Sequence, residues 1–361
     1  MAMKKATSVT TDVRRTPTPA PTKPVPPQRR PDTRTNSNGA RTPLRAGQLG
    51  AGTEDLRARL EKQVIGQGHA IDAVVSSWAR LLSGLRDSNR PLLTALLMGP
   101  TGVGKTETTR ALATALFGTE QALHRINCEE YAHGHEVAKL LGSPPGYVGA
   151  DIEPLLSQRR IDRPHFEQRQ AAEAEDAADV EPLLIEQVHD LDRGLHSILL
   201  FDEVEKAHPT VWNALLGILD EGRVTLGDNT TTDLKRSVIL MTTNVGSREM
   251  GAAVGSVPLG FAAESGDAPA ADALAGIAAN AAREAFPAEF LNRFDQTLVY
   301  HPLRERDLSR IFDKFLGAVN ERTIEQAGVP MLIKTTSRAK ALVVESGTDP
   351  GRVRCGVRSN V

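Results

Sequence analysis

The stretch LLMGPTGVGKTETTRALA, from Leu96 to Ala113, decides the fold. It holds the pattern G-x-x-x-x-G-K-[ST] between an apolar run that predicts a strand and a segment that predicts a helix, the context of a phosphate-binding loop. Glycines let backbone N–H groups turn inward around phosphate oxygens, and the following helix adds its positive end. We expect eight residues to bind the nucleotide: Gly99, Pro100, Thr101, Gly102, Val103, Gly104, Lys105 and Thr106.

A second segment supplies the acids that such a loop needs. Lys105 is expected to reach the β- and γ-phosphates, and the Thr106 hydroxyl to bind Mg²⁺. The run SILLFDE (197–203) predicts a buried strand that ends in Asp202 and Glu203. Asp202 would organise Mg²⁺ and Glu203 would polarise the attacking water, although a pair of acids at a strand end also serves as a helix cap. The predicted cofactors are therefore ATP and Mg²⁺, and the predicted reaction is hydrolysis of ATP.

Apolar runs recur along the chain with helical segments between them. Alternating strands and helices predict an α/β fold, a parallel five-stranded sheet with helices on both faces. The expected strands are 92–99, 124–128, 197–203, 237–244 and 297–301. After Pro302 the pattern changes to a long amphipathic helix, a short strand (331–334) and a further helix (337–346), which predicts a small, mainly helical second domain.

Two segments differ in composition from the rest. The first fifty residues contain eight prolines and ten Lys or Arg against two Asp, which predicts a disordered tail over 1–52. The large domain would then cover 53–301 and the small one 302–361. Within the large domain, residues 166–193 hold nine acidic and two basic side chains, which predicts an acidic insertion. A solvated surface explains both segments, and docking of a partner is the alternative.

Overall composition excludes several classes of protein. The net charge of −2 gives no global field that favours nucleic acid. No apolar run approaches the length that crosses a bilayer, and the first residues lack a secretory signal. Cys128 and Cys355 are too few and too far apart for a disulfide framework, which suits a reducing compartment. We expect a cytoplasmic protein that binds neither nucleic acid nor membrane.

Several sequence blocks, in the same order along the chain, resemble those of the Clp-type AAA+ ATPases. Within that family, the blocks are most similar to the second ATPase module of the two-ring unfoldases. The resemblance spans roughly residues 62 to 350. The blocks are NRPLLTALLMGPTGVGKTE, LLGSPPGYVG, LLFDEVEKAHPTVWNALLGILDEGRVT, MTTNVGS and FPAEFLNRFDQTLVYHPL, preceded by Val64-Ile65-Gly66-Gln67. This resemblance implies that Val64 and Ile65 contact the adenine, that Asn244 is a polar sensor of the γ-phosphate, and that Arg293 is an arginine finger for a neighbouring subunit. From the residues alone, Arg293 would be a surface ion-pair residue.

The same resemblance implies what the ATP energy is used for. Gly146, Tyr147, Val148 and Gly149 match the loop that, in that family, lines the central pore of a ring and grips an unfolded polypeptide. Glycines free the backbone and tyrosine offers a large amphipathic face, although a tyrosine packed on its own domain fits the spacing equally well. GRVTLGDNTTTDLKR (222–236) resembles the hairpin that carries a second pore loop in related proteins.

Two further matches are short. Leu259, Gly260 and Phe261 are similar to the tripeptide by which related ATPases dock on the Clp peptidase. Arg358 is the nearest match to the arginine by which the family's lid domain contacts the nucleotide, and the helix expected after it is missing. We therefore expect an incomplete lid and a truncated or frame-shifted chain end.

Together these features predict a ring-forming homo-oligomer, a hexamer, that hydrolyses ATP and threads protein substrates through its pore. Two alternatives fit the same residues. One is a motor dedicated to disassembly of a single complex. The other is a catalytically impaired subunit that binds ATP and serves assembly, because its lid is incomplete.

Overall fold

The computed structural model describes residues 51–82, 87–147, 149–164, 195–255, 271–327 and 333–347. These residues belong to one compact unit, Leu49–Val361. Four sets of predictions lie outside the described residues: the tail up to residue 50, Val148, the acidic insertion 166–193, and both short matches, Leu259–Phe261 and Arg358.

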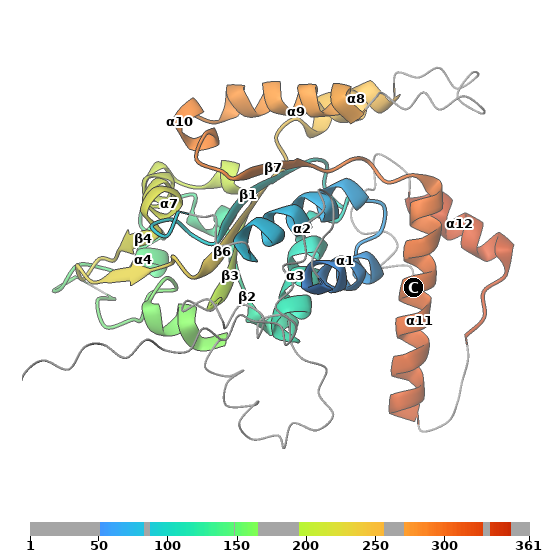
Figure 1. Ribbon diagram of the computed structural model, residues 1–361, viewed down its shortest axis with the longest axis horizontal. Coiled ribbons are helices and arrows are strands. Elements are labelled where there is room, and N and C mark those ends of the chain that lie inside the picture. Colours follow the sequence, from blue (N-terminus) through green and yellow to red (C-terminus); the bar gives the residue numbers. More distant parts are fainter. Residues whose placement is uncertain are drawn as a thin grey trace, which may run out of the picture. The chain divides into compact units, whose positions relative to one another are not determined.

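A five-stranded parallel sheet forms the centre of the molecule (Figure 1), and this confirms the predicted fold class. The strand order is β2-β3-β6-β1-β7. Each strand lies within two residues of its predicted bounds. The strands are β1 (Leu93–Met98), β2 (Leu123–Asn127), β3 (Ser197–Asp202), β6 (Ser237–Thr243) and β7 (Gln296–Val299).

The three inner strands are buried at every position, as expected of strands covered on both faces. Successive side chains along a strand point to opposite faces of the sheet. Leu97, Leu200 and Leu240 accordingly pack in one core cluster. Leu96 and Leu199 pack in the other cluster. Two hydrophobic cores, one on each face, therefore hold the sheet in place.

Different helices complete the two cores (Figure 1). The first core contains side chains from α1 (Ala51–Gln63), α2 (Gly68–Leu82) and α3 (Lys105–Phe117). The second contains side chains from helices that follow in the chain, namely α4 (Val137–Leu141), α7 (Pro209–Glu221), α8 (Ser247–Gly255), α9 (Ala271–Ala285) and α10 (Ala288–Leu291). Among the described residues, three short 3₁₀ segments lie between helices and strands: η1 (Glu120–Ala122), η2 (Cys128–Tyr131) and η3 (Val204–Lys206).

The predicted hairpin is present. Strands β4 (Arg223–Thr225) and β5 (Thr231–Asp233) pair antiparallel within residues 222–236. Beyond Pro302, α11 (Glu305–Ala327) and α12 (Ser337–Gly347) match the two predicted helices. Ile333 and Lys334 do not lie in a strand, and the rest of the strand predicted at 331–334 is outside the described residues.

Helix α11 contacts the larger part of the chain through Lys314. Its ammonium donates to the carbonyl of Gln63 at 2.7 Å and lies 3.3 Å from Glu107 Oε1. The division at residue 302 into two domains stays a prediction. No helix among the described residues has the length and apolar character needed to cross a membrane.

The reactivity of Cys128 tests directly whether the core is closed to solvent at the end of β2. Its side chain is fully buried, and burial raises the pKa of the thiol to about 12. We expect a Cys355→Ser variant to show no reaction with a disulfide reagent at pH 8, because the thiolate is the reactive form. One thiol should react after unfolding in guanidinium. Rapid reaction of the folded variant would contradict the placement of Cys128.

Candidate functional site

The phosphate-binding loop joins β1 to α3 at the carboxyl edge of the sheet. Gly99 has a φ of 143°, and a Cβ there would lie 2.7 Å from the Tyr300 carbonyl oxygen, so only glycine fits. Gly104 caps α3 with a φ of 106°, and a Cβ there would meet nothing within 4 Å. The open space beside Gly104 and the free N–H groups of the helix start form a cradle that suits a phosphate.

Lys105, the first residue of α3, lies within this loop. Its ammonium donates to the Gly99 carbonyl, to the Pro100 carbonyl at 2.9 Å and to Asn244 Oδ1 at 2.9 Å. Burial lowers the pKa of Lys105 to about 8, and the charges of nearby carboxylates, of which Glu205 contributes most, act in the opposite direction. A buried ammonium with this balance is stabilised by any further anion, and a phosphate is such an anion.

Asp202 ends β3 beside this loop and is almost fully buried. Its Oδ2 accepts hydrogen bonds from the Arg125 guanidinium on β2, at 2.6 Å from Nη2 and 3.0 Å from Nε. Its Oδ1 accepts from the Thr242 hydroxyl on β6. The carboxylate is therefore fixed by both neighbouring strands, which is how a buried charge is tolerated.

Glu203 follows in the left-handed region, with a φ of 56°, which is uncommon for a residue other than glycine. Its backbone N–H donates to the Thr242 hydroxyl at 3.0 Å, so Thr242 joins both acids. In the side chain, Oε1 accepts from Asn244 Nδ2 at 2.9 Å, and Oε2 lies 2.7 Å from the Lys206 ammonium. The unusual backbone turns the Glu203 carboxylate toward the residues that follow β6.

Asn244 lies at the centre of the site. Its amide oxygen accepts from Lys105 and, at 3.4 Å, from the Thr101 hydroxyl, while its amide nitrogen donates to Glu203. Its backbone N–H donates to Glu205 Oε1 at 3.0 Å. One side chain thus connects the phosphate-binding loop with the second acid.

The turn predicted to contact adenine lies between α1 and α2. Val64 is buried in the first core, and Ile65 is half-buried. The next polar residue, Gln67, is fully buried and donates to the Val103 carbonyl at 3.1 Å and to the His301 carbonyl at 2.8 Å. Gln67 therefore holds this turn against the phosphate-binding loop.

Arg293 is far from this cluster, near the amino end of β1. Its guanidinium pairs with Asp220 at 2.9 Å and with Glu289 at 2.6 Å. Two residues later, the Asp295 N–H donates to the Thr94 carbonyl at 3.0 Å. Gly99 follows five residues after Thr94, so at about 3.3 Å per residue the loop begins roughly 17 Å further along the strand. Arg293 makes the ion pairs that its residue type suggests, and it does not join the site of its own chain.

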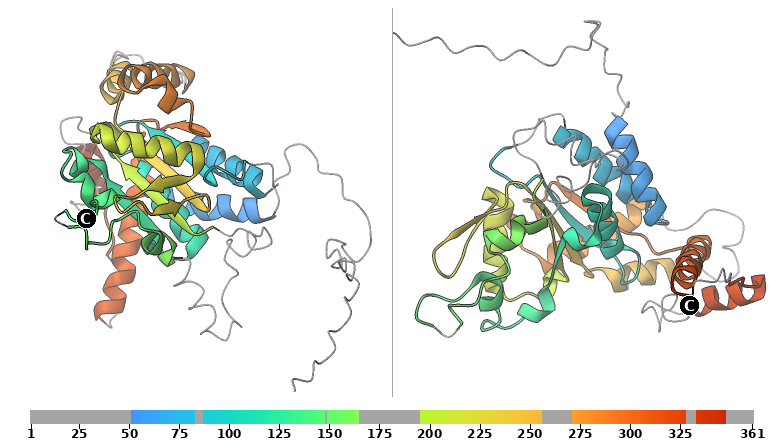
Figure 2. Two further views of the ribbon diagram at one scale, coloured as in Figure 1. Left: turned by 90° about the vertical axis from the view of Figure 1, so that its left-hand side faces the viewer. Right: turned by 90° about the horizontal axis from the view of Figure 1, so that it is seen from below.

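Tyr147 is exposed, with 71% of its surface accessible, between glycines whose φ values are 89° and 87°. The alternative of a tyrosine packed on its own domain is therefore wrong. Ile152, five residues later, is 65% exposed. Both belong to one loop that follows α4, on the side of the sheet where the β4–β5 hairpin lies (Figure 2).

That hairpin and the Tyr147 loop are joined backbone to backbone. The Gly227 N–H donates to the Leu141 carbonyl at 2.8 Å, and a Cβ on Gly227 would lie 2.5 Å from the Gly142 carbonyl oxygen. No side chain fits between the two segments. They are therefore expected to move together.

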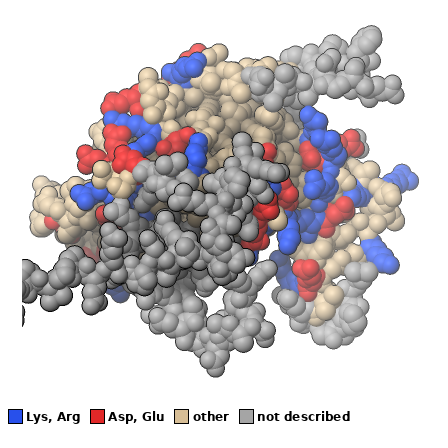
Figure 3. All heavy atoms as spheres, in the orientation of Figure 1, with Lys and Arg blue, Asp and Glu red and all other residues tan. Residues whose placement is uncertain are grey.

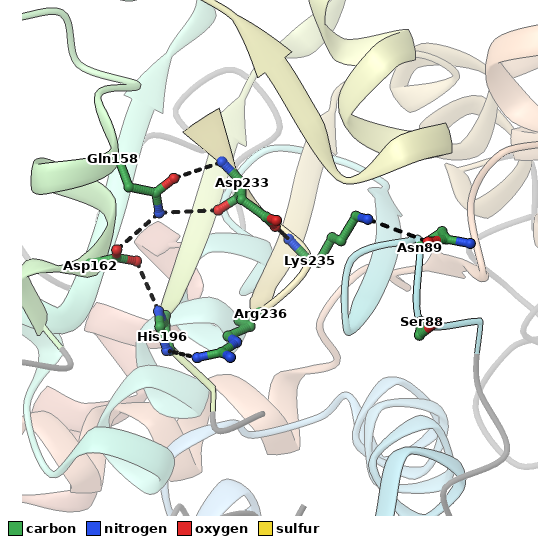
Figure 4. A pocket seen from close by; sticks show the side chains of 8 residues that line it. All are labelled: Ser88, Asn89, Gln158, Asp162, His196, Asp233, Lys235 and Arg236. Carbon is green, nitrogen blue, oxygen red and sulfur yellow. Dashed lines mark hydrogen bonds and ion pairs between the residues drawn. The ribbon is translucent and has the colours of Figure 1, made fainter. Parts of the chain in front are cut away.

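A pocket of about 380 Å³ lies at the opposite edge of the sheet, before β1, β3 and β6 (Figure 4). Its polar groups bond to one another: His196 Nδ1 to Asp162 Oδ1 at 2.9 Å, and Arg236 Nη1 to His196 Nε2 at 3.0 Å. The pocket is remote from the phosphate-binding loop, and the hydrogen bonds among its lining residues link the segments that precede these strands. It is lined by Ser88, Asn89, Gln158, Asp162, His196, Asp233, Lys235 and Arg236.

The described surface carries charges of both signs. On the face shown in Figure 3, Lys and Arg lie interspersed with Asp and Glu among the described residues. This distribution agrees with the small net charge of −2.

Lys105, Asp202, Glu203 and Asn244 are the predicted site residues that the structure brings together. Their partners Arg125, Thr242, Glu205 and Lys206 were not predicted. The only available signal for two of these was the run Val204-Glu205-Lys206 directly after the acids. Arg125 and Thr242 lie on other strands, and only the strand order brings them to Asp202.

Comparison with known proteins gives consistent results. The family model "AAA domain (Cdc48 subfamily)" matches residues 90–166 and 166–297. Chaperone protein ClpB of Rhizobium meliloti is 35% identical over 295 residues, which are 82% of this chain and 29% of that protein. The ATP-binding subunit ClpC of an ATP-dependent Clp protease from Staphylococcus epidermidis is 34% identical over 298 residues, 82% of this chain and 32% of that protein.

Among solved structures, a closed state of Hsp104 with ATPγS and FITC casein has a TM-score of 0.64 at 28% identity. It covers 86% of this chain and 46% of the Hsp104 chain. The chain thus spans about a third of the length of its ClpB and ClpC relatives and about half of the solved structure.

Proposed function

Because this chain belongs to the AAA domain family, Cdc48 subfamily, we propose that it is an ATPase that unfolds or remodels polypeptides. The observation that carries the proposal is the position of Asn244, which connects Lys105 of the phosphate-binding loop with Glu203. An amide between these two groups is placed to respond to a γ-phosphate and to orient a water beside it. The names of the ClpB, ClpC and Hsp104 relatives support protein remodelling as the use of the ATP energy.

The residues present fit ATP and Mg²⁺. The phosphates would lie on the N–H groups of residues 99–106 with Lys105 as the counter-charge. Thr106 and Asp202 would hold Mg²⁺. Mg²⁺ at a phosphate-binding loop is held by one or two protein ligands together with phosphate oxygens. When bound, the ion would neutralise charge on the β- and γ-phosphates.

For the hydrolytic step, we assign Glu203 as the group that accepts a proton from the attacking water. Asn244 holds one oxygen of the carboxylate, so that a single geometry is preferred. Thr242 fixes the backbone at Glu203 and the carboxylate of Asp202 with one hydroxyl. Side chains of this chain therefore orient both acids before any nucleotide or metal ion binds.

Arg293 is proposed to act on the site of a neighbouring subunit. Its own site begins roughly 17 Å away along β1, beyond the reach of an arginine side chain. A guanidinium that comes from the neighbour neutralises charge on the transferred phosphoryl group. The proposal requires a closed ring with heterologous interfaces, and we propose a cytoplasmic hexamer. The polypeptide would pass through its pore and contact Tyr147.

Subunit mixing tests this arrangement. We expect Arg293→Ala and Lys105→Ala to be strongly impaired in ATP hydrolysis when each is alone. In mixed rings, the Lys105→Ala subunit supplies the arginine to an intact site next to it, so a 1:1 mixture should regain about a quarter of wild-type activity with random assembly. Glu289→Gln is the matched control, because it breaks one ion pair of Arg293 and keeps the guanidinium. No recovery in the mixture would contradict action between subunits.

Two finer assignments rest on residues that the structure does not describe. Docking of a Clp-type peptidase through Leu259, Gly260 and Phe261 stays a prediction, which a Phe261→Ala variant tests by loss of peptidase-dependent degradation. The role of Arg358 as a lid residue stays a prediction as well.

A further inference from the structure

The side chain of Lys206 contacts both the acid assigned to ATP hydrolysis and the turn that leads toward the Tyr147 loop. Its ammonium lies 2.7 Å from Glu203 Oε2 and 3.0 Å from Glu129 Oε1. Glu203 is the acid assigned to the water. Glu129 belongs to η2, the turn that follows β2 and precedes α4. We name this Glu129–Lys206–Glu203 contact the lysine bridge.

Both oxygens of the Glu203 carboxylate are engaged. Asn244 donates to Oε1 at 2.9 Å, and Lys206 occupies Oε2. The hydrogen bonds that the ammonium donates to the two carboxylates raise the pKa of Lys206 above its ordinary value, the bond to Glu203 most strongly. The ammonium therefore stays charged, and its position decides how firmly Oε2 is held.

The Glu129 end of the lysine bridge is continuous with the Tyr147 loop. After η2 the chain forms α4 and then turns at Gly142 into the loop. The returning segment of the loop is tied to α4, because Leu155 N–H donates to the Lys139 carbonyl at 3.1 Å and Leu156 N–H to the Leu140 carbonyl at 3.2 Å. A shift of the loop is thus passed to α4 and to the turn that bears Glu129.

The Lys206 end is fixed to the sheet. Lys206 lies in η3, directly after Glu203, and its N–H donates to the Glu203 carbonyl at 3.0 Å. η3 also lies against η2, since the His208 N–H donates to the Tyr131 carbonyl at 2.9 Å. A shift of η2 relative to Glu203 therefore involves this backbone hydrogen bond as well as the Lys206 side chain.

We propose that Lys206 is a positioning residue, and that the lysine bridge couples the Tyr147 loop to the carboxylate of Glu203. The coupling rests on the proposed function and deepens it. When a polypeptide displaces the loop, Glu129 shifts and its contact with the Lys206 ammonium becomes weaker or stronger. The contact between Lys206 and Glu203 Oε2 changes in the opposite direction. ATP turnover then responds to the polypeptide without any new contact at the nucleotide.

The test measures the ratio of kcat for ATP with and without unfolded casein. In Glu129→Gln we expect this ratio to fall to about one, because the amide no longer competes for Lys206. The KM for ATP should stay within about twofold of wild type, since Glu129 does not touch the phosphate-binding loop. Glu129→Asp keeps the charge and should restore part of the response. Glu130→Gln, the adjacent acid that contacts Asn127 at 3.4 Å, is the matched control and should keep the full ratio.

Lys206→Met provides a second variant that removes the other side of the lysine bridge, and it should also abolish the response. A wild-type ratio in Glu129→Gln, with the ratio lost in Tyr147→Ala, would overturn the lysine bridge and leave the proposed function intact. A wild-type protein that hydrolyses no ATP with or without casein would overturn both.

Discussion

Replacement of Glu203 by Gln is expected to lower kcat for ATP hydrolysis about a thousandfold, the range of a lost general base. Gln keeps the size of the side chain and accepts the hydrogen bond from Asn244, but it cannot take a proton from water. Lys105 and the loop of residues 99–106 are unchanged, so affinity for ATP should remain within about threefold of wild type. Single-turnover hydrolysis and binding of a fluorescent ATP analogue measure the two quantities.

The matched control for this variant is Glu205→Gln. Glu205 also contacts Asn244, but through the backbone N–H at 3.0 Å. Its removal should reduce activity far less than removal of Glu203. Equal losses in the two variants would mean that the carboxylates act only by fixing Asn244, and the assignment of Glu203 as the proton acceptor would be wrong.

Replacement of Tyr147 by Ala is expected to abolish unfolding of a tagged model substrate while ATP hydrolysis without substrate continues. Tyr147 is 71% exposed and makes no contribution to either core cluster, so its loss should leave the fold unchanged. What is lost is a large amphipathic surface for contact with a passing chain. The decay of fluorescence of a tagged fluorescent protein reports the unfolding rate.

Ile152→Ala offers the comparison within the same loop. Ile152 is 65% exposed, so both variants remove an exposed apolar side chain of one segment. If exposure of apolar surface alone mattered, the two would behave alike. We expect Ile152→Ala to keep most of the unfolding rate. Full unfolding by Tyr147→Ala would remove the pore assignment.

The local features of this site could be predicted from the sequence because they depend on spacing. Lys105 follows directly from the glycine pattern, and Asp202 and Glu203 follow from the apolar strand that they end. Asn244 ends the fourth expected strand, and parallel strands bring their carboxyl ends to one edge of the sheet. Position along the chain was sufficient for Lys105, Asp202 and Glu203, whereas the role of Asn244 was implied by the family resemblance.

Contacts between side chains on different strands could not be predicted in this way. Arg125 reaches Asp202 because β2 pairs with β3 in a register that sets Asn127 beside Asp202. The spacing of residues along the chain predicts neither which strands pair nor the register in which they pair. Lys206 and Glu129 meet for the same reason, since they follow two neighbouring strands. The positions of these charged residues became evident only once the strand order was known.

The position of Arg293 shows a different limit. The residue pattern favours an ion-pair residue, and the structure shows that it pairs with Asp220 and Glu289. Its role toward a neighbouring subunit depends on an interface that no single chain contains. The distance along β1 shows only that it cannot serve its own site.

The most direct test of the central claim is co-elution of Glu203→Gln with labelled casein in the presence of ATP. We predict that casein elutes with the assembled protein at the size of a ring, because ATP is bound and hydrolysis does not release the polypeptide. The double variant Glu203→Gln/Tyr147→Ala should form the same ring without casein. Elution of casein apart from the Glu203→Gln ring, or equal capture by the double variant, would contradict a motor that grips polypeptide through Tyr147.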